Sequence, residues 1–200
     1  MIYLHRINSI EDLNIVPLDK GIEFDVREYK GEIVVSHDYE RPGPLLSDFL
    51  KKAKDHELII NVKSEGLIEE VLSYLDGNQI VNYFFLDLNY PEMVKLKSQD
   101  NYKFAVRLSE YESIDKSINL NPKWIWVDCF NHYDVTINDI KLIREVGAKI
   151  CLVSPELQRK NFDINTVPEL LRLEIDAVCT KIYNASKWQF FFSDRNKDYQ

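Results

Sequence analysis

The run Tyr83-Phe84-Phe85-Leu86, together with Leu58-Ile59-Ile60 before it, decides the fold of this 200-residue chain. Both stretches are unbroken apolar runs, without the polar–apolar alternation of a strand that faces water on one side. Such runs are typical of parallel strands that are covered on both faces. We therefore expect an α/β architecture in which helices cover a parallel sheet.

Six further strand-like stretches alternate with helix-like segments along the chain. The eight expected strands are Ile2–His5, Gly21–Val26, Glu57–Val62, Asn82–Asp87, Lys103–Leu108, Trp124–Cys129, Ala148–Val153 and Asp176–Thr180. The expected helices are Leu45–Lys54, Leu67–Leu75, Pro91–Ser98, Ile137–Val146 and Thr166–Leu173, with Ser47, Asn138 and Thr166 as candidate caps. This alternation predicts a single-domain (β/α)8 TIM barrel, and an open doubly wound sheet is the structural alternative.

The composition indicates how many domains to expect and which classes of partner are disfavoured. A hydrophobic fraction of 45% is sufficient for one well-buried domain, and no Pro/Gly/Ser-rich linker interrupts the pattern. We expect residues 1–183 to form the barrel and residues 184–200 to form an aromatic tail that packs on the barrel or on a partner. The net charge of −8, without a cluster of Lys and Arg, argues against a nucleic-acid partner.

The distribution of apolar residues and cysteines indicates the compartment in which the protein is expected. No stretch approaches about 18 uninterrupted apolar residues, so we expect no membrane span, and the first residues read as a strand rather than a signal peptide. Cys129, Cys151 and Cys179 are an odd and widely spaced set in apolar runs. They predict buried, reduced thiols in a cytoplasmic protein. The oligomeric state has no signature in the sequence.

Two carboxylates lie near the end of the second expected strand. Glu23 and Asp25 are two residues apart, so their side chains point to the same side of the strand. Two neighbouring anions favour a cation between them, and oxygen ligands favour Mg²⁺ or Ca²⁺. The alternative interpretation is an exposed acidic strand.

Two histidines accompany these carboxylates. His5 closes the first strand, and His37 ends the short run Glu32–Ser36, which we expect to form an excursion over the barrel mouth. Histidine titrates near neutrality, so the pair can pass a proton to and from oxygen atoms. Asp38 either orients an imidazole or caps a turn. His56 and His132 have no such context and are expected on the surface.

Further polar residues close later strands. Lys63 is a candidate to neutralise a phosphate oxygen, and Asn61 can offer a carbonyl oxygen to a metal, although both also suit the start of the next helical segment. In a barrel all strand ends converge on one rim, which makes Arg107 and Lys181 candidate anion clamps. Asp87 and Asp128 are candidates for an additional carboxylate.

Taken together, these residues resemble the glycerophosphodiester phosphodiesterase family of phospholipase C-like phosphodiesterase barrels. The similar segments are His5-Arg6, Glu23-Phe24-Asp25-Val26, Val34-Val35-Ser36-His37-Asp38, Asn61-Val62-Lys63, Gly147 through Ser154, and Asp176-Ala177-Val178-Cys179-Thr180. They cover the chain in order from residue 2 to residue 183.

The resemblance implies a metal-dependent hydrolase of a small phosphodiester. It implies that Glu23 and Asp25 bind the metal, with Asn61 at the position of a third ligand. It also implies that His5 and His37 handle protons. The resemblance also implies that Arg6 and Lys63 contact the phosphate. Arg107 and Lys181 are expected to contact it because they lie at strand ends.

Three departures from the family pattern keep other functions open. Asn61 stands where the family has Glu, and Lys181 stands where it has Asp. The short segment between His37 and Asn61 lacks the inserted subdomain that helps the family recognise glycerol, and in this respect resembles spider-venom phospholipase D, which has Asp-x-Lys at that site. The alternatives are a non-hydrolytic binding protein for a phosphorylated or nucleotide-linked ligand, and an intramolecular transferase that forms a cyclic phosphate.

Overall fold

The computed structural model of the chain describes residues 1–98 and 103–195, which divide into two compact units. The N-terminal unit comprises residues 3–104, and the C-terminal unit comprises residues 1–2 and the described chain from residue 105. Eight parallel strands alternate with helices across these units, in the pairing order β5-β4-β2-β1-β9-β8-β7-β6. This confirms the predicted class, a (β/α)8 barrel.

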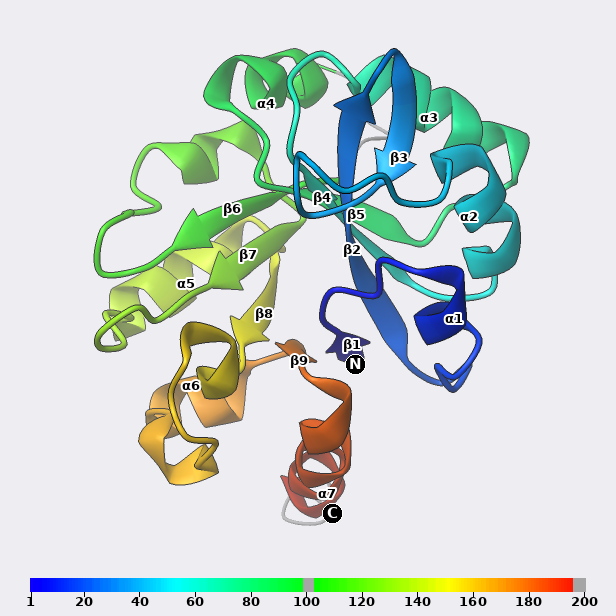
Figure 1. Cartoon of the computed structure of the whole chain (residues 1–200). Helices are drawn as coiled ribbons and strands as arrows, with labels where there is room; N and C mark the ends of the chain where they lie inside the picture. Colours follow the sequence, from blue (N-terminus) through cyan, green and yellow to red (C-terminus); the bar gives the residue numbers. More distant parts are fainter. Residues whose placement is uncertain (99–102, 196–200) are drawn as a thin grey trace. The chain divides into compact units, whose positions relative to one another are not determined.

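The N-terminal unit contains one half of the parallel strands and one antiparallel hairpin (Figure 1). Its strands are β1 (Ile2–Leu4), which begins in the C-terminal unit, β2 (Gly21–Tyr29), β3 (Glu32–Val35), β4 (Leu58–Val62) and β5 (Tyr83–Leu86). Its helices are α1 (Ile10–Leu13), α2 (Leu46–Ala53), α3 (Ile68–Gly77) and α4 (Tyr90–Lys97). β3 pairs antiparallel with the second half of β2, which accounts for the extra short run in the sequence.

Burial explains why the apolar runs form these strands. All five residues of β4 are buried, as are the first six residues of β2. Helix α2 covers β2 with an apolar stripe at helical spacing, in which Phe49 packs on Phe24 with ring centroids 4.8 Å apart. The β-sheet register pairs Asp25 with Asn61, and Asn61 with Leu86, so the polar strand ends of this unit lie on adjacent strands.

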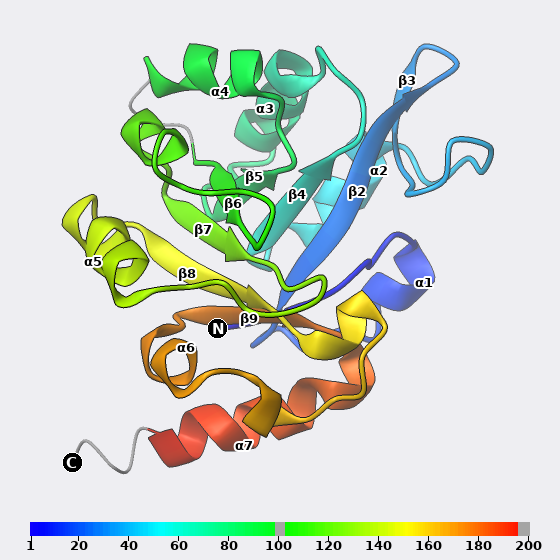
Figure 2. The ribbon, with the colours of Figure 1, turned by 90° about the vertical axis from the view of Figure 1, so that its left-hand side faces the viewer.

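The C-terminal unit contains the other parallel strands (Figure 2). They are β6 (Ala105–Leu108), β7 (Trp124–Val127), β8 (Lys149–Val153) and β9 (Ala177–Thr180). The helices are α5 (Ile137–Glu145), α6 (Glu169–Glu174) and α7 (Ala185–Arg195), with short 3₁₀ segments η1 (Ser117–Leu120), η2 (Pro155–Gln158), η3 (Ile164–Thr166) and η4 (Ile182–Asn184). Cys129, Cys151 and Cys179 are buried, as predicted.

Helix α7 attaches to its unit through a fully buried tryptophan. The indole N–H of Trp188 donates a hydrogen bond to Ser154 Oγ at 2.9 Å, and its ring packs edge-on against Phe162 and Phe191. Residues 196–200 of the expected tail lie outside the described residues. Among the helices that are described, none combines the length and the apolarity needed to cross a bilayer.

Three predicted caps and one predicted surface residue are wrong. The residues at the cap positions of α2, α5 and α6 are Leu45, Thr136 and Pro168, instead of Ser47, Asn138 and Thr166. In α5 the reason is a reciprocal capping box between Thr136 and Asp139. His56 is 6% exposed, and its Nδ1 lies 3.0 Å from the carbonyl oxygen of Lys20, whereas His132 is exposed as expected.

Candidate active site

Strands β2 and β4 place three oxygen-bearing side chains together in the N-terminal unit. Glu23 and Asp25 are each 1% exposed, and Asn61 is 8% exposed. Asn61 faces Asp25 across the β2–β4 register, and its Nδ2 donates to Glu23 Oε1 at 2.9 Å. This burial rules out the alternative of an exposed acidic strand.

Glu23 is the most strongly perturbed acid of this group. Its Oε2 accepts the backbone N–H of Arg6 at 2.7 Å and lies 3.8 Å from His5 Nε2. Burial and the neighbouring charge of Asp25 raise the pKa of Glu23 to about 7, against the opposing effect of the hydrogen bonds from Asn61 and Arg6. A proton therefore resides on this carboxyl over part of the neutral pH range.

Asp25 is held by an asparagine that the sequence did not single out. Asn8 Nδ2 donates to Asp25 Oδ2 at 2.7 Å, and the Asp25 backbone N–H donates to Asn8 Oδ1 at 2.9 Å. Two cations flank the same carboxylate: Arg6 Nε lies 3.8 Å from Oδ2, and Lys63 Nζ lies 3.6 Å from Oδ1. The Arg6 and Lys63 side chains thus supply positive charge beside the buried acids.

Two residues at the site adopt left-handed backbone conformations. Arg6 has φ 64° immediately after His5, and Asp87 has φ 60° immediately after β5. Such conformations are uncommon outside glycine and concentrate at functional sites. The Asp87 carboxylate accepts a hydrogen bond from Lys63 Nζ at 3.0 Å, so it shares this ammonium group with Asp25.

His37 lies beside an acidic partner at the end of the β2–β3 hairpin. Its Nδ1 is 2.9 Å from Asp38 Oδ1, and the side chain is 40% exposed. The hydrogen bond with His37 holds the pKa of Asp38 below its usual value, and the charges of Arg41 and Arg6 act in the same direction. An Nδ1–H donated to Asp38 leaves Nε2 as the basic nitrogen of the ring.

The loop that carries His37 is fixed at both of its ends. Ser36 Oγ donates to the carbonyl oxygens of Asp38 and Arg41, at 3.0 and 2.7 Å. The Val35 N–H donates to the Pro44 carbonyl at 2.9 Å. A Cβ at Gly43 would come within 1.7 Å of the Val35 carbonyl oxygen, so only glycine permits this close approach.

Arg107 and Lys181 belong to the C-terminal unit. Arg107 Nη1 donates to the buried carboxylate of Asp128, and its Nε lies 3.3 Å from Glu112 Oε2. The backbone N–H of Lys181 donates to Glu156 Oε1 at 3.0 Å. The expected role of both residues as anion clamps stays a prediction, and two carboxylates already neutralise Arg107.

Glu110, in the loop after β6, is another residue that the sequence did not reveal. Its carboxylate accepts the backbone N–H groups of Asn131, Phe130 and His132 from the loop after β7. Burial acts to raise the pKa of Glu110, but these hydrogen bonds outweigh it and lower the pKa to about 2. The ionised carboxylate therefore fixes the loop after β7.

The donor set of the N-terminal unit fits a hard divalent cation. Asn61 Oδ1 is buried and accepts no hydrogen bond within the described chain, although a buried acceptor normally has a partner. Glu23, Asp25 and this amide oxygen are the residues that would hold Mg²⁺ or Ca²⁺. No group of three or more His, Cys, Asp or Glu residues suited to a metal occurs within residues 1–98 and 103–195, so the two carboxylates would need the amide oxygen to complete a set of three protein donors.

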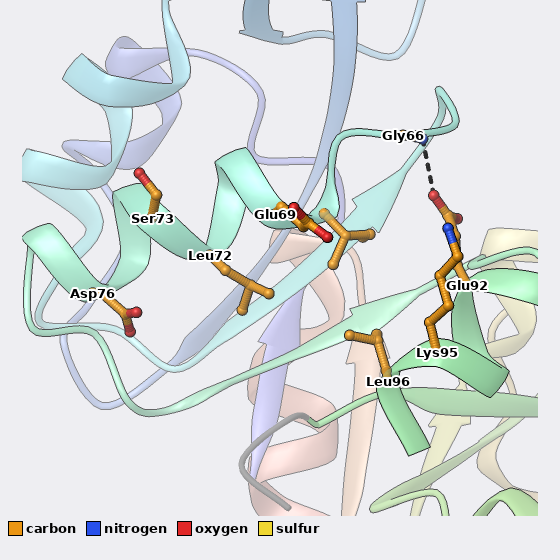
Figure 3. A pocket seen from close by; sticks show the side chains of 9 residues that line it. Gly66, Glu69, Leu72, Ser73, Asp76, Glu92, Lys95 and Leu96 are labelled. Carbon is orange, nitrogen blue, oxygen red and sulfur yellow. Dashed lines mark hydrogen bonds between the residues drawn. The ribbon is translucent and has the colours of Figure 1, made fainter. Parts of the chain in front are cut away.

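A separate hollow lies between α3 and α4. It has a volume of about 440 Å³ and is lined by Gly66, Ile68, Glu69, Leu72, Ser73, Asp76, Glu92, Lys95 and Leu96. Figure 3 shows the hydrogen bond from the Gly66 N–H to Glu92 Oε1, which measures 2.9 Å. The lining carries three carboxylates and one lysine, a charge balance that disfavours a phosphate ligand.

Comparison of the structure with solved structures identifies its fold. A glycerophosphodiester phosphodiesterase from Parabacteroides distasonis superposes with a TM-score of 0.63 at 15% identity, covering 100% of this chain and 98% of that chain. One from Agrobacterium tumefaciens gives 0.65 at 14% identity, over 90% and 96%. An Oleispira antarctica phosphodiesterase in complex with the product sn-glycerol-3-phosphate gives 0.63 at 16% identity, over 90% and 92%.

These likenesses define the class of the fold. The chain has the barrel fold of the glycerophosphodiester phosphodiesterases along its whole length. No protein-family model matches the sequence. No curated protein matches it significantly.

Proposed function

We propose that this protein hydrolyses a small phosphodiester by acid–base catalysis with His5 and His37. The observation that carries the proposal is the contact of His5 with the buried acid group: His5 Nε2 lies 3.8 Å from Glu23 Oε2, and Glu23 is hydrogen-bonded to Asn61. An imidazole and a set of oxygen donors thus share one site in the N-terminal unit.

In this reaction water attacks phosphorus and one P–O ester bond breaks. One imidazole takes the proton that the attacking water loses, and the other, as an imidazolium, gives a proton to the leaving alkoxide. Asp38 favours the His37 tautomer in which Nε2 is the reactive nitrogen, because its carboxylate lies 2.9 Å from Nδ1.

Positive charge at the site stabilises the negative charge on the phosphoryl oxygens. Arg6 and Lys63 supply this charge from the protein itself and lie on opposite oxygens of Asp25. Glu23, Asp25 and Asn61 would hold Mg²⁺ or Ca²⁺, which when bound supplies Lewis-acid stabilisation of the same oxygens. Asn61 in place of a carboxylate lowers the negative charge of this set, so we propose weak cation binding.

The substrate that we propose is a phosphodiester of small alcohols. One solved structure of this fold is in complex with the product sn-glycerol-3-phosphate, which supports a small-molecule ligand. In this chain only residues 38–44 lie between His37 and the N-cap residue of α2. This loop is held by the hydrogen bonds of Ser36 and by the close packing of Gly43. We therefore propose that recognition of the alcohol groups relies on the short loop and its Tyr39 and Arg41 side chains.

The test is hydrolysis of bis(p-nitrophenyl) phosphate with Mg²⁺, Ca²⁺ or Mn²⁺, against the same protein in EDTA. Release of p-nitrophenolate that requires a cation is the expected result. Absence of product, with thermal stabilisation by a phosphodiester, would instead indicate a binding protein. Phosphorus NMR of a substrate with a hydroxyl next to the phosphate would distinguish hydrolysis from formation of a cyclic phosphate.

A further inference from the structure

Lys63 lies between two carboxylates, only one of which belongs to the donor set for the cation. Its Nζ is 3.0 Å from Asp87 Oδ2 and 3.6 Å from Asp25 Oδ1. The Lys63 and Asp87 side chains are 22% and 28% exposed, so solvent screens this pair less than it screens an ion pair on the surface. The shorter distance shows that Asp87 holds the ammonium group more directly.

The backbone of Asp87 is consistent with a functional position. With φ 60° it occupies the left-handed region immediately after β5, where glycine carries no steric cost. Aspartate tolerates this region better than most residues do, and such conformations persist where the surrounding structure holds them. Here the left-handed residue carries the carboxylate that binds Lys63.

The register explains what Asp87 adds to the site. Asn61 on β4 is a neutral residue, and its partner across the register is Leu86, the residue before Asp87. The residue that follows the adjacent strand β5 therefore provides a carboxylate next to Lys63. Glu23, Asp25 and Asp87 do not form a three-acid metal group among the described residues.

We propose that Asp87 is a positioning residue that draws the Lys63 ammonium away from Asp25. Without it, Lys63 would close the 3.6 Å gap to Asp25 Oδ1, occupy the oxygen that the cation needs, and withdraw from the phosphoryl group. The inference rests on the proposed phosphodiesterase function.

The first experiment compares wild type with Asp87→Asn, since Asn tolerates the left-handed backbone and removes only the charge. With bis(p-nitrophenyl) phosphate and Mg²⁺, we expect kcat to fall on the order of tenfold to a hundredfold, with a much smaller change in KM. The increase in Tm caused by Mg²⁺ should also shrink. Asp48→Asn is the matched control, because Asp48 forms a 2.8 Å pair with Lys51 on the exposed face of α2.

A double-mutant comparison shows whether Asp87 acts through Lys63. Adding Asp87→Asn to Lys63→Met should lower kcat no further than Lys63→Met alone. If the double variant loses kcat by the product of the two single losses, the inference is overturned. An Asp87→Asn variant with wild-type kcat would also overturn it.

A crystal structure of Asp87→Asn separates this inference from the proposed function. We expect Lys63 Nζ within about 3.2 Å of Asp25 Oδ1, a direct hydrogen bond. An unchanged Lys63 position would overturn the positioning role whether or not the wild type is a phosphodiesterase. If the wild type hydrolyses nothing, the proposed function fails while this measurement still decides the role of Asp87. If Asp87→Asn does not fold, Asp87→Gly removes the carboxylate and the left-handed strain together, and the same distance is measured.

Discussion

Asn8 and Asp25 are joined by two reciprocal hydrogen bonds, side chain to side chain at 2.7 Å and backbone to side chain at 2.9 Å. The pair ties the segment after β1 to the middle of β2. It also fixes the orientation of the Asp25 carboxylate, whose Oδ1 lies near Lys63 and whose Oδ2 lies near Arg6. Asn8 thereby sets the geometry of the acid that the proposed cation site depends on.

Asn8→Ala should destabilise the protein by about 1–3 kcal/mol, because it leaves the buried carboxylate and N–H of Asp25 without these partners. Urea unfolding followed by circular dichroism measures the change in the free energy of unfolding. Asn14→Ala, at an exposed position after α1, is the control and should change it by less than about 0.5 kcal/mol. Equal stability of the two variants would show that the hydrogen bonds to Asp25 carry no energy.

His5→Ala and His37→Ala should each lower kcat for bis(p-nitrophenyl) phosphate by on the order of 10²–10⁴, since each removes one proton-transfer group. Circular dichroism should show an intact fold for both variants. His132→Ala, at an exposed position in the C-terminal unit, is the control and should keep wild-type turnover. Unchanged turnover in both His5→Ala and His37→Ala would exclude the proposed mechanism.

The stability of the protein in EDTA should fall as the pH rises from about 4.5 to about 7. Burial and the charge of Asp25 raise the pKa of Glu23 from 4.5 to about 7, so the folded state binds this proton more tightly than the unfolded state does. The stabilisation is fully present below pH 4.5 and is lost as the pH passes 7. Its size is on the order of 3 kcal/mol.

Glu23→Gln is the comparison that isolates this contribution. The variant has no carboxyl to titrate at position 23, so its free energy of unfolding should depend less steeply on pH in this window. Urea titrations at half-unit pH steps in EDTA measure both slopes. Parallel curves for wild type and variant would mean that Glu23 ionises normally in the folded protein.

Trp188→Ala should destabilise the C-terminal unit by about 3–5 kcal/mol, because it removes a fully buried indole and leaves Ser154 Oγ without the indole N–H as a donor. Phe190→Ala on the same helix is the control, since Phe190 is 69% exposed. Thermal unfolding should show a large decrease in Tm for the first variant and a small one for the second. Similar Tm values would mean that α7 is not anchored through Trp188.

The strands were predictable because buried strands have unbroken apolar runs in the sequence. β4 and β5 lie within one residue of their expected bounds at each end. β2 extends to Tyr29, beyond the expected Val26, because its last residues pair with β3 rather than enter the core. Alternating exposure in Arg27–Tyr29 breaks the apolar run, so the sequence indicated an end where the strand continues.

The candidate site was predictable only where the strand period fixes a direction. Two-residue spacing placed Glu23 and Asp25 on one side of β2, and both are buried. Asn8 was not predicted, because loop geometry and not periodicity brings it to a residue 17 positions away. The same holds for His56, whose partner Lys20 lies 36 positions away.

Gly43 limits how the segment after His37 can change in sequence and length. Its contact with the Val35 carbonyl leaves no space for any side chain, so a residue other than glycine at this position would push the loop away from the end of β3. Extra residues between Tyr39 and Arg41 would separate the Asp38 and Arg41 carbonyl groups that Ser36 Oγ holds, so the whole segment after His37 is expected to tolerate insertions poorly.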